Sequence, residues 1–173
     1  MIIFKDRVTG DELFTDASCP KLNEDGTMYT FSTKYITVKE GEDIKLAGAN
    51  PSAEEAQEET EAVTKTDFDF VLSNRLQNIP LGSKKDLQLF IKGFFKNMKT
   101  CMQEAGDEEE KVKCFENSAK GFVKDMLENW KDYSFFQGET MDEKGMCIIV
   151  KWNDDGTSGT AYAFRDGLKE EKY

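Results

Sequence analysis

The chain has 173 residues, which is enough for one domain with a sizeable core and too few for two. Its net charge of −11 argues against a general nucleic-acid-binding protein, because such proteins bind by neutralising phosphates with positive charge. The chain contains no histidine, so the commonest general base, the usual activating partner of a nucleophilic serine or cysteine, and the commonest metal ligand are all missing.

The N-terminal part of the chain predicts short strands separated by turns. Residues 1–4 are apolar, and residues 28–31 and 35–38 are rich in the aromatic and β-branched side chains that favour strands. A turn is predicted at 23–26, where Asn-Glu-Asp-Gly ends in a glycine that tolerates positive φ.

Residues 40–65 are acidic, and they predict a long mobile loop. A turn is indicated at Asn50, because a proline follows it. From Glu54 to Glu61 the segment has too few apolar side chains to offset the entropy lost on ordering. The FDFVL run at 68–72 then predicts a buried strand.

Between 83 and 131 the hydrophobic period changes to that of a helix. Apolar side chains recur at i, i+3, i+4 and i+7 from 87 to 102 and again from 112 to 130. Ser83 is a suitable N-cap for the first helix, and the acidic run at 107–110 suits the N-terminus of the second. This pattern predicts a helical hairpin whose apolar faces belong to the core.

The C-terminal part predicts another β-hairpin, with strands at 146–152 and 160–164 joined by a turn at 153–156. Strands, then a pair of helices, then strands predict an α+β domain with the helices segregated from the sheet.

Lysines on the first predicted helix are the strongest functional signal in the residues themselves. Their spacings of seven, four and three place them on one stripe of the helix, and Asp86 is the only acid between 83 and 102. These lysines are Lys85, Lys92, Lys96 and Lys99. A basic face on an acidic protein predicts docking to an acidic partner surface, and an ordinary solvated helix face is the alternative. A second stripe with acidic neighbours consists of Lys113, Lys120, Lys124 and Lys131.

The cysteines do not predict a metal site. They are widely spaced without a C-x-x-C pair, and they comprise Cys19, Cys101, Cys114 and Cys147. We expect Cys101, on an apolar helix face, and Cys147, in a strand, to be buried. Because we find neither a secretion signal nor an apolar run of about 18 residues, we expect a cytoplasmic protein with reduced thiols and no membrane insertion.

Several segments resemble one known family. Residues 47–57, AGANPSAEEAQ, resemble the first sequence signature of the translationally controlled tumour protein family, and residues 134–146, SFFQGETMDEKGM, resemble its second. The opening MIIFKDRVTGDELFTD and the Asp-Gly-Leu at 166–168 are also similar to the ends of the family pattern. The chain departs from that pattern at Trp130, Gln137 and Tyr173.

The resemblance implies an α+β fold, a β-tent of two small sheets with an inserted helical hairpin. It also implies a relation to a zinc-bearing accessory protein of Rab GTPases and to methionine-R-sulfoxide reductases, whose metal-binding cysteines are missing here. The domain would cover 1–173, with the mobile loop at about 40–65 and the hairpin at about 83–131.

The functions implied by the resemblance are those of a non-enzymatic, monomeric interaction protein in growth, survival and cytoskeletal regulation. Glu12, with Asp11 beside it, would contact a small Ras-superfamily GTPase, whereas the bland interpretation of this pair is a solubilising turn. The hairpin would bind tubulin or microtubules, to whose acidic tails the lysine stripe is suited. A thiol-based reductase or antioxidant enzyme on the related fold is the alternative.

Calcium binding is also implied, but no twelve-residue loop of the helix–loop–helix type is present, so we expect it to be weak. No tightly bound cofactor is expected. The candidate carboxylates are Asp154 with Asp155, or Glu40 with Glu42 and Asp43. The sequence does not choose between them, and the metal site stays unknown.

Overall fold

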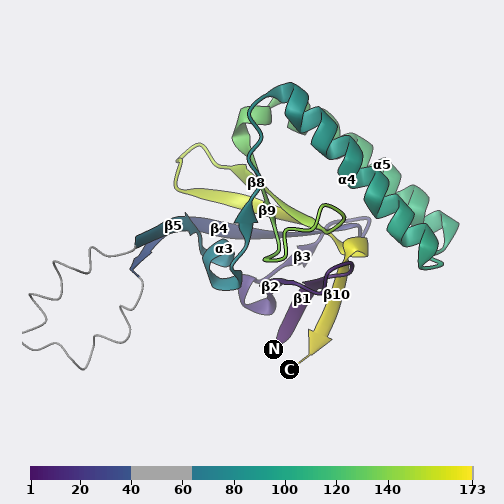
Figure 1. Cartoon of the computed structure of the whole chain (residues 1–173), viewed down its shortest axis with the longest axis horizontal. Coiled ribbons are helices and arrows are strands. Elements are labelled where there is room, and N and C mark those ends of the chain that lie inside the picture. Colours follow the sequence, from purple (N-terminus) through teal and green to yellow (C-terminus); the bar gives the residue numbers. More distant parts are fainter. Residues whose placement is uncertain (40–63, 173) are drawn as a thin grey trace, which may run out of the picture.

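The computed structural model describes residues 1–39 and 64–172 (Figure 1). A smaller antiparallel sheet has the strand order β10-β1-β2, formed by Leu168–Lys172, Ile2–Asp6 and Glu12–Thr15. Its pairing of Ile2 with Lys172 brings the two ends of the chain together.

The larger sheet has the order β3-β4-β9-β8-β7-β6, and β5 pairs with the outer part of β4. Its strands are β3 (Lys21–Leu22), β4 (Met28–Lys39), β5 (Thr64–Phe68), β6 (Gln77–Asn78), β7 (Tyr133–Gln137), β8 (Cys147–Trp152) and β9 (Ser158–Phe164). The helices are α3 (Asp69–Asn74), α4 (Lys84–Glu104) and α5 (Glu109–Glu128). Short 3-10 turns occupy Asp16–Ser18, Trp130–Asp132 and Arg165–Gly167.

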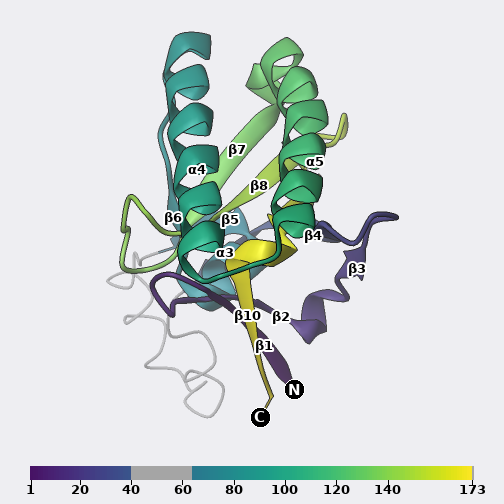
Figure 2. The same ribbon diagram turned by 90° about the vertical axis from the view of Figure 1, so that its right-hand side faces the viewer.

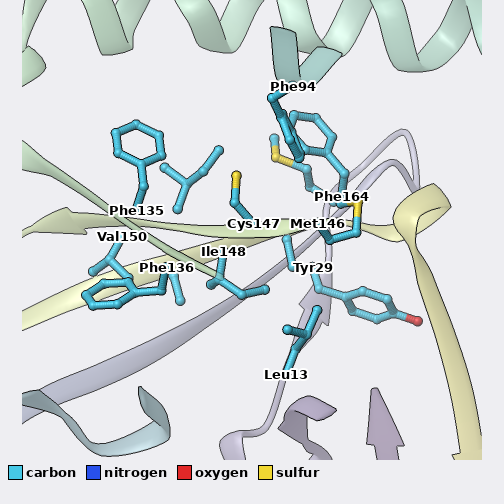
Figure 3. Close-up of a cluster of buried hydrophobic side chains, with 14 of the residues drawn as sticks. Leu13, Tyr29, Phe94, Phe135, Phe136, Met146, Cys147, Ile148, Val150 and Phe164 are labelled. Atoms are coloured by element: carbon cyan, nitrogen blue, oxygen red, sulfur yellow. The ribbon is translucent and has the colours of Figure 1, made fainter. Parts of the chain in front are cut away.

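The larger sheet is buried on both faces along β7 and the first part of β8, whereas β3, β6 and most of β5 are exposed. The helical pair α4–α5 crosses one face, and the smaller sheet and α3 lie on the other (Figures 1 and 2). Figure 3 shows Phe135 and Cys147 pointing towards the helices, and Phe136 and Ile148 pointing the other way. This alternation follows from the pleat, and it explains why the apolar residues from Cys147 to Val150 are consecutive.

Phenylalanine rings attach α4 and α5 to the sheet. Phe164 of β9 is fully buried, with its ring centroid 5.1 Å from that of Phe115 on α5 and 5.5 Å from that of Phe95 on α4. Such edge-to-face contacts add to the burial of large apolar side chains. At the start of α4, the Ser83 hydroxyl accepts a hydrogen bond from the Asp86 N–H, as expected for an N-cap.

The predicted α+β class and two-sheet architecture with a helical pair are confirmed, but the strand predicted at 68–72 is wrong. Only Phe68 is in a strand, and α3 begins at Asp69, whose carboxylate accepts a hydrogen bond from the Phe70 N–H at 2.7 Å. Phe70 and Val71 are both buried although they are consecutive, because a helix can turn both towards one core. The FDFVL run at 68–72 is therefore not a strand signal here.

Other predicted elements differ in extent. The strands predicted at 28–31 and 35–38 are one continuous strand, β4, while β2, β7 and β10 were not predicted. Of the predicted mobile loop, residues 40–63 lie outside the described residues, and the last two belong to β5. Among the residues described, no helix is long and apolar enough to cross a membrane.

Candidate functional site

Glu12 lies at a corner between the two sheets. The carboxylate of Asp6 holds this corner together. Asp6 is 2% exposed, and its Oδ1 accepts a hydrogen bond from the Val8 N–H at 2.7 Å within the β1–β2 turn. Its Oδ2 accepts another from the Met146 N–H, also at 2.7 Å, on the segment that leads into β8. Gly145 leaves room for this carboxylate, because a Cβ there would lie 2.7 Å from Oδ2.

Asp11 makes a second clamp across the same corner. Its carboxylate accepts hydrogen bonds from the Thr140 N–H at 3.0 Å and the Thr140 hydroxyl at 2.6 Å. A Cβ on Gly138 would lie 2.4 Å from Asp11 Oδ2, so the glycine is required by this contact. Burial opposes ionisation of Asp11, but the hydrogen bonds from Thr140 outweigh it and hold the pKa of Asp11 below its usual value.

Glu12 is in a different position from its neighbour. Its side chain is exposed and makes no hydrogen bond or ion pair with another described residue. Of the predicted pair, Glu12 is therefore available to a partner, whereas Asp11 is a positioning residue that connects the opening segment to the second signature.

The corner also contains residues that sequence reasoning did not connect. A hollow of about 440 Å³ opens beside Glu12. It is lined by Asp11, Glu12, Ser73, Asn74, Arg75 and Glu139. We call this the Glu12 corner. Glu139 belongs to the second signature, and its neighbourhood to Glu12 depends on the Asp6 and Asp11 clamps that the sequence does not display.

The lysine stripe, Lys85, Lys92, Lys96 and Lys99, is exposed on the side of α4 opposite its buried face. Figure 2 views the outer side of the helical pair, where α4 and α5 run side by side. Leu89 is 63% exposed and falls between Lys85 and Lys92 at helical spacings of four and three. The stripe thus includes an apolar side chain that the sequence analysis overlooked.

Although Asp86 is the only acid between 83 and 102, one end of the stripe meets a carboxylate of the neighbouring helix. Lys99 Nζ lies 2.6 Å from Glu116 Oε1 of α5, and the hydrogen bond from Lys99 lowers the pKa of Glu116. A count of acids along one helix misses a carboxylate supplied by its neighbour. The other three lysines make no ion pair with any residue in the described part of the chain.

In the second predicted stripe, Lys113 is the one lysine that forms an ion pair with a described residue, and its acidic neighbour Asp125 is occupied by a lysine outside the stripe. Lys113 lies 3.8 Å from Glu109, and Asp125 is bound by Lys151 of β8 at 3.1 Å. Lys131 lies beyond α5, in the 3-10 turn Trp130–Asp132.

All four cysteines are free thiols. Cys147 is buried at the start of β8 as expected, and burial raises the pKa of its thiol. Cys101 is half-buried, not fully buried as expected, and Cys19 is exposed.

Of the calcium candidates, Asp155 has a structural role in a turn. Asp155 accepts hydrogen bonds from the Thr157 N–H at 2.8 Å, the Ser158 N–H at 3.0 Å and the Ser158 hydroxyl at 2.8 Å, so its oxygens stabilise the turn before β9. Among the described residues, no three or more Cys, Asp or Glu side chains are grouped to hold a metal. Glu40, Glu42 and Asp43 lie outside these residues.

The family model of the translationally controlled tumour protein matches residues 1–169. The chain belongs to the translationally controlled tumour protein family. It is 40% identical to a homologue from Schizosaccharomyces pombe over the full length of both chains, and 39% identical to one from Aedes albopictus, likewise at full coverage.

Solved structures of this family have the same fold. The structure of the S. pombe protein p23fyp matches with a TM-score of 0.74 at 40% identity and covers all of both chains. The solution structure of the Caenorhabditis elegans member matches with a TM-score of 0.70 at 33% identity, covering 100% of this chain and 99% of that one.

The clamp at Asp11 predicts a pH-dependent contribution to stability. Replacing Asp11 by alanine should lower the free energy of unfolding by about 1 kcal/mol at neutral pH, because Thr140 loses its acceptor. Since the pKa of Asp11 is lowered in the folded state, this contribution is present above the unfolded-state value of about 3.9 and disappears as the pH falls through the folded-state pKa. Urea unfolding of both proteins over this pH range measures it.

Glu12→Ala is the matched control, and its free energy of unfolding should stay within about 0.5 kcal/mol of wild type. Equal stability of wild type and Asp11→Ala at neutral pH would contradict the clamp.

Proposed function

We propose that this family member is a non-enzymatic, monomeric interaction protein of the cytoplasm that docks acidic partner surfaces through the lysine stripe, with tubulin as the preferred partner. The proposal is carried by one observation. Lys85, Lys92 and Lys96 are exposed and unpaired among the described residues, on a protein whose net charge is −11. Their field is locally opposite in sign to that of the whole molecule, which favours an acidic partner.

The tubulin hypothesis is tested by replacing the four lysines of the stripe with glutamine. Each exposed contact is worth roughly 0.2–1 kcal/mol, so the four together should weaken microtubule co-sedimentation by about tenfold or more. Added salt should weaken wild-type binding as the screening length falls below about 10 Å. The circular dichroism spectrum should be unchanged, because these side chains do not contribute to the core.

A matched control with the same change in charge replaces four exposed lysines elsewhere, namely Lys21, Lys34, Lys144 and Lys169. This variant should co-sediment like wild type. If both variants lose microtubule co-sedimentation equally, the effect comes from net charge alone, and the stripe is an ordinary solvated helix face.

We also propose that the Glu12 corner contacts a small Ras-superfamily GTPase. In support, Glu12 is exposed without a partner among the described residues and shares a hollow with Glu139 and Arg75. Exposed charged side chains of this kind determine the specificity and the association rate of a complex more than its affinity.

Glu12→Ala should weaken binding to a cognate GTPase in a purified panel by about fivefold, measured by biolayer interferometry. Glu24→Ala, which removes an exposed carboxylate from the β3–β4 turn, is the control and should bind normally. A GTPase that binds wild type and Glu12→Ala with the same Kd would place the contact elsewhere.

Calcium binding, on this proposal, is weak, with a Kd on the order of 10⁻⁴ to 10⁻³ M, because the described carboxylates do not converge. Calorimetric titration of the full chain measures it, and a sub-micromolar Kd would contradict it. The proposed role in growth and survival follows from the family alone. A thiol-based reductase is disfavoured at Cys147, since its raised pKa leaves little thiolate to react.

A further inference from the structure

The outer side of the helical pair is hollowed between α4 and α5. This groove measures about 420 Å³, a volume typical of ligand sites. Its floor is apolar and is formed by Phe95 of α4 with Phe115, Ala119 and Val123 of α5. Phe115 and Ala119 are buried at 1% and 4% exposure, while Phe95 and Val123 are half-buried.

Charged side chains form the rim of the groove. Lys96 and Lys99 belong to α4, and Glu116 and Lys120 belong to α5. Glu116 is engaged by Lys99 at 2.6 Å, so the negative charge of the rim is already neutralised. Lys96 and Lys120, one from each helix, make no ion pair with a described residue. The rim therefore presents two available positive charges above an apolar floor.

We propose that this groove binds an acidic peptide segment of a partner protein through one bulky apolar side chain, aromatic or leucine, that inserts between the helices. The inference rests on the proposed docking of acidic partners and assigns the anchor point within that surface. An apolar patch with a charged rim is typical of a protein-binding site. Binding energy at such sites is concentrated in a few buried anchors, often aromatic.

The charges select this occupant over others. A purely apolar ligand would use the floor but not Lys96 and Lys120. A purely acidic segment would gain only the weak attraction of exposed lysines, roughly 0.2–1 kcal/mol each, and would not use the floor. An acidic segment with one apolar anchor satisfies both features, and Lys85 and Lys92 lie outside the groove.

The test uses three synthetic peptides and the full chain, followed by amide NMR titration. The parent peptide carries one phenylalanine among glutamates, the second has alanine in place of that phenylalanine, and the third has glutamines in place of the glutamates. Replacing phenylalanine by alanine should weaken binding about tenfold or more, because the ring loses its burial on the floor. The neutral peptide should bind about fivefold or more weakly, because it loses the lysines.

Two double variants separate the groove from the rest of the stripe at equal change in charge. Lys96→Gln with Lys120→Gln should weaken binding of the parent peptide about fivefold, whereas Lys85→Gln with Lys92→Gln should change it less than about twofold. Equal losses in the two variants, or equal binding of the phenylalanine and alanine peptides, would overturn the proposal. Self-association of the wild-type protein would also overturn the proposal if the Lys96 and Lys120 changes abolish it and the parent peptide does not bind. The occupant of the groove would then be a second copy of this chain.

Microtubule co-sedimentation of the same variants keeps the two proposals distinguishable. If both double variants lose microtubule binding equally, the stripe docks without the groove, and only the groove proposal fails. If the parent peptide binds the groove but microtubules do not sediment the protein, tubulin docking fails and the groove proposal stands.

Discussion

The strands β7 and β8 of the larger sheet have to be covered on both faces, and the rest of the architecture follows from this constraint. Within β8 the buried residues Cys147 and Ile148 point to opposite sides, so no face of this strand can meet water. Phe135 meets Phe90 of α4 on one side, at 5.5 Å between ring centroids, while Phe136 meets Phe70 of α3 on the other, at 6.1 Å. The helical pair and the smaller sheet with α3 are the two covers that this burial requires.

These covers leave two regions of the surface for partners. Because α4 uses one side for the core, its opposite side can carry lysines without affecting packing. The second region is the junction of the sheets, where Asp6 and Asp11 accept hydrogen bonds from the segment before β8. A buried carboxylate is costly unless such donors satisfy it, so this junction is held in one geometry, with Glu12 displayed on its outer side.

The amount that could be predicted from the sequence depends on how local each signal is. The Ser83 cap and the helical pair were predictable because a period of 3.6 and an N-cap are properties of neighbouring residues. The helix α3 was not, since its few residues show no full period. The pairing of Lys99 with Glu116 and the hollow shared by Glu12 and Glu139 depend on tertiary contacts, which neither helix pattern nor signature spacing contains.

The carboxylates and lysines of this protein therefore divide into those that shape the fold and those that are free for recognition. Asp6 and Asp11 are bound by backbone donors, and their removal should cost stability. The side chains of Lys96, Lys120 and Glu12 make no hydrogen bond or ion pair with a described residue, so changing them should leave the free energy of unfolding nearly unaltered. Because the recognition groups contribute little to folding, a loss of binding in their variants can be attributed to the surface itself. The groove differs in one respect: Phe115 and Ala119 of its floor belong to the core, so folding fixes the shape there, while the charged rim sets the charge that a partner meets.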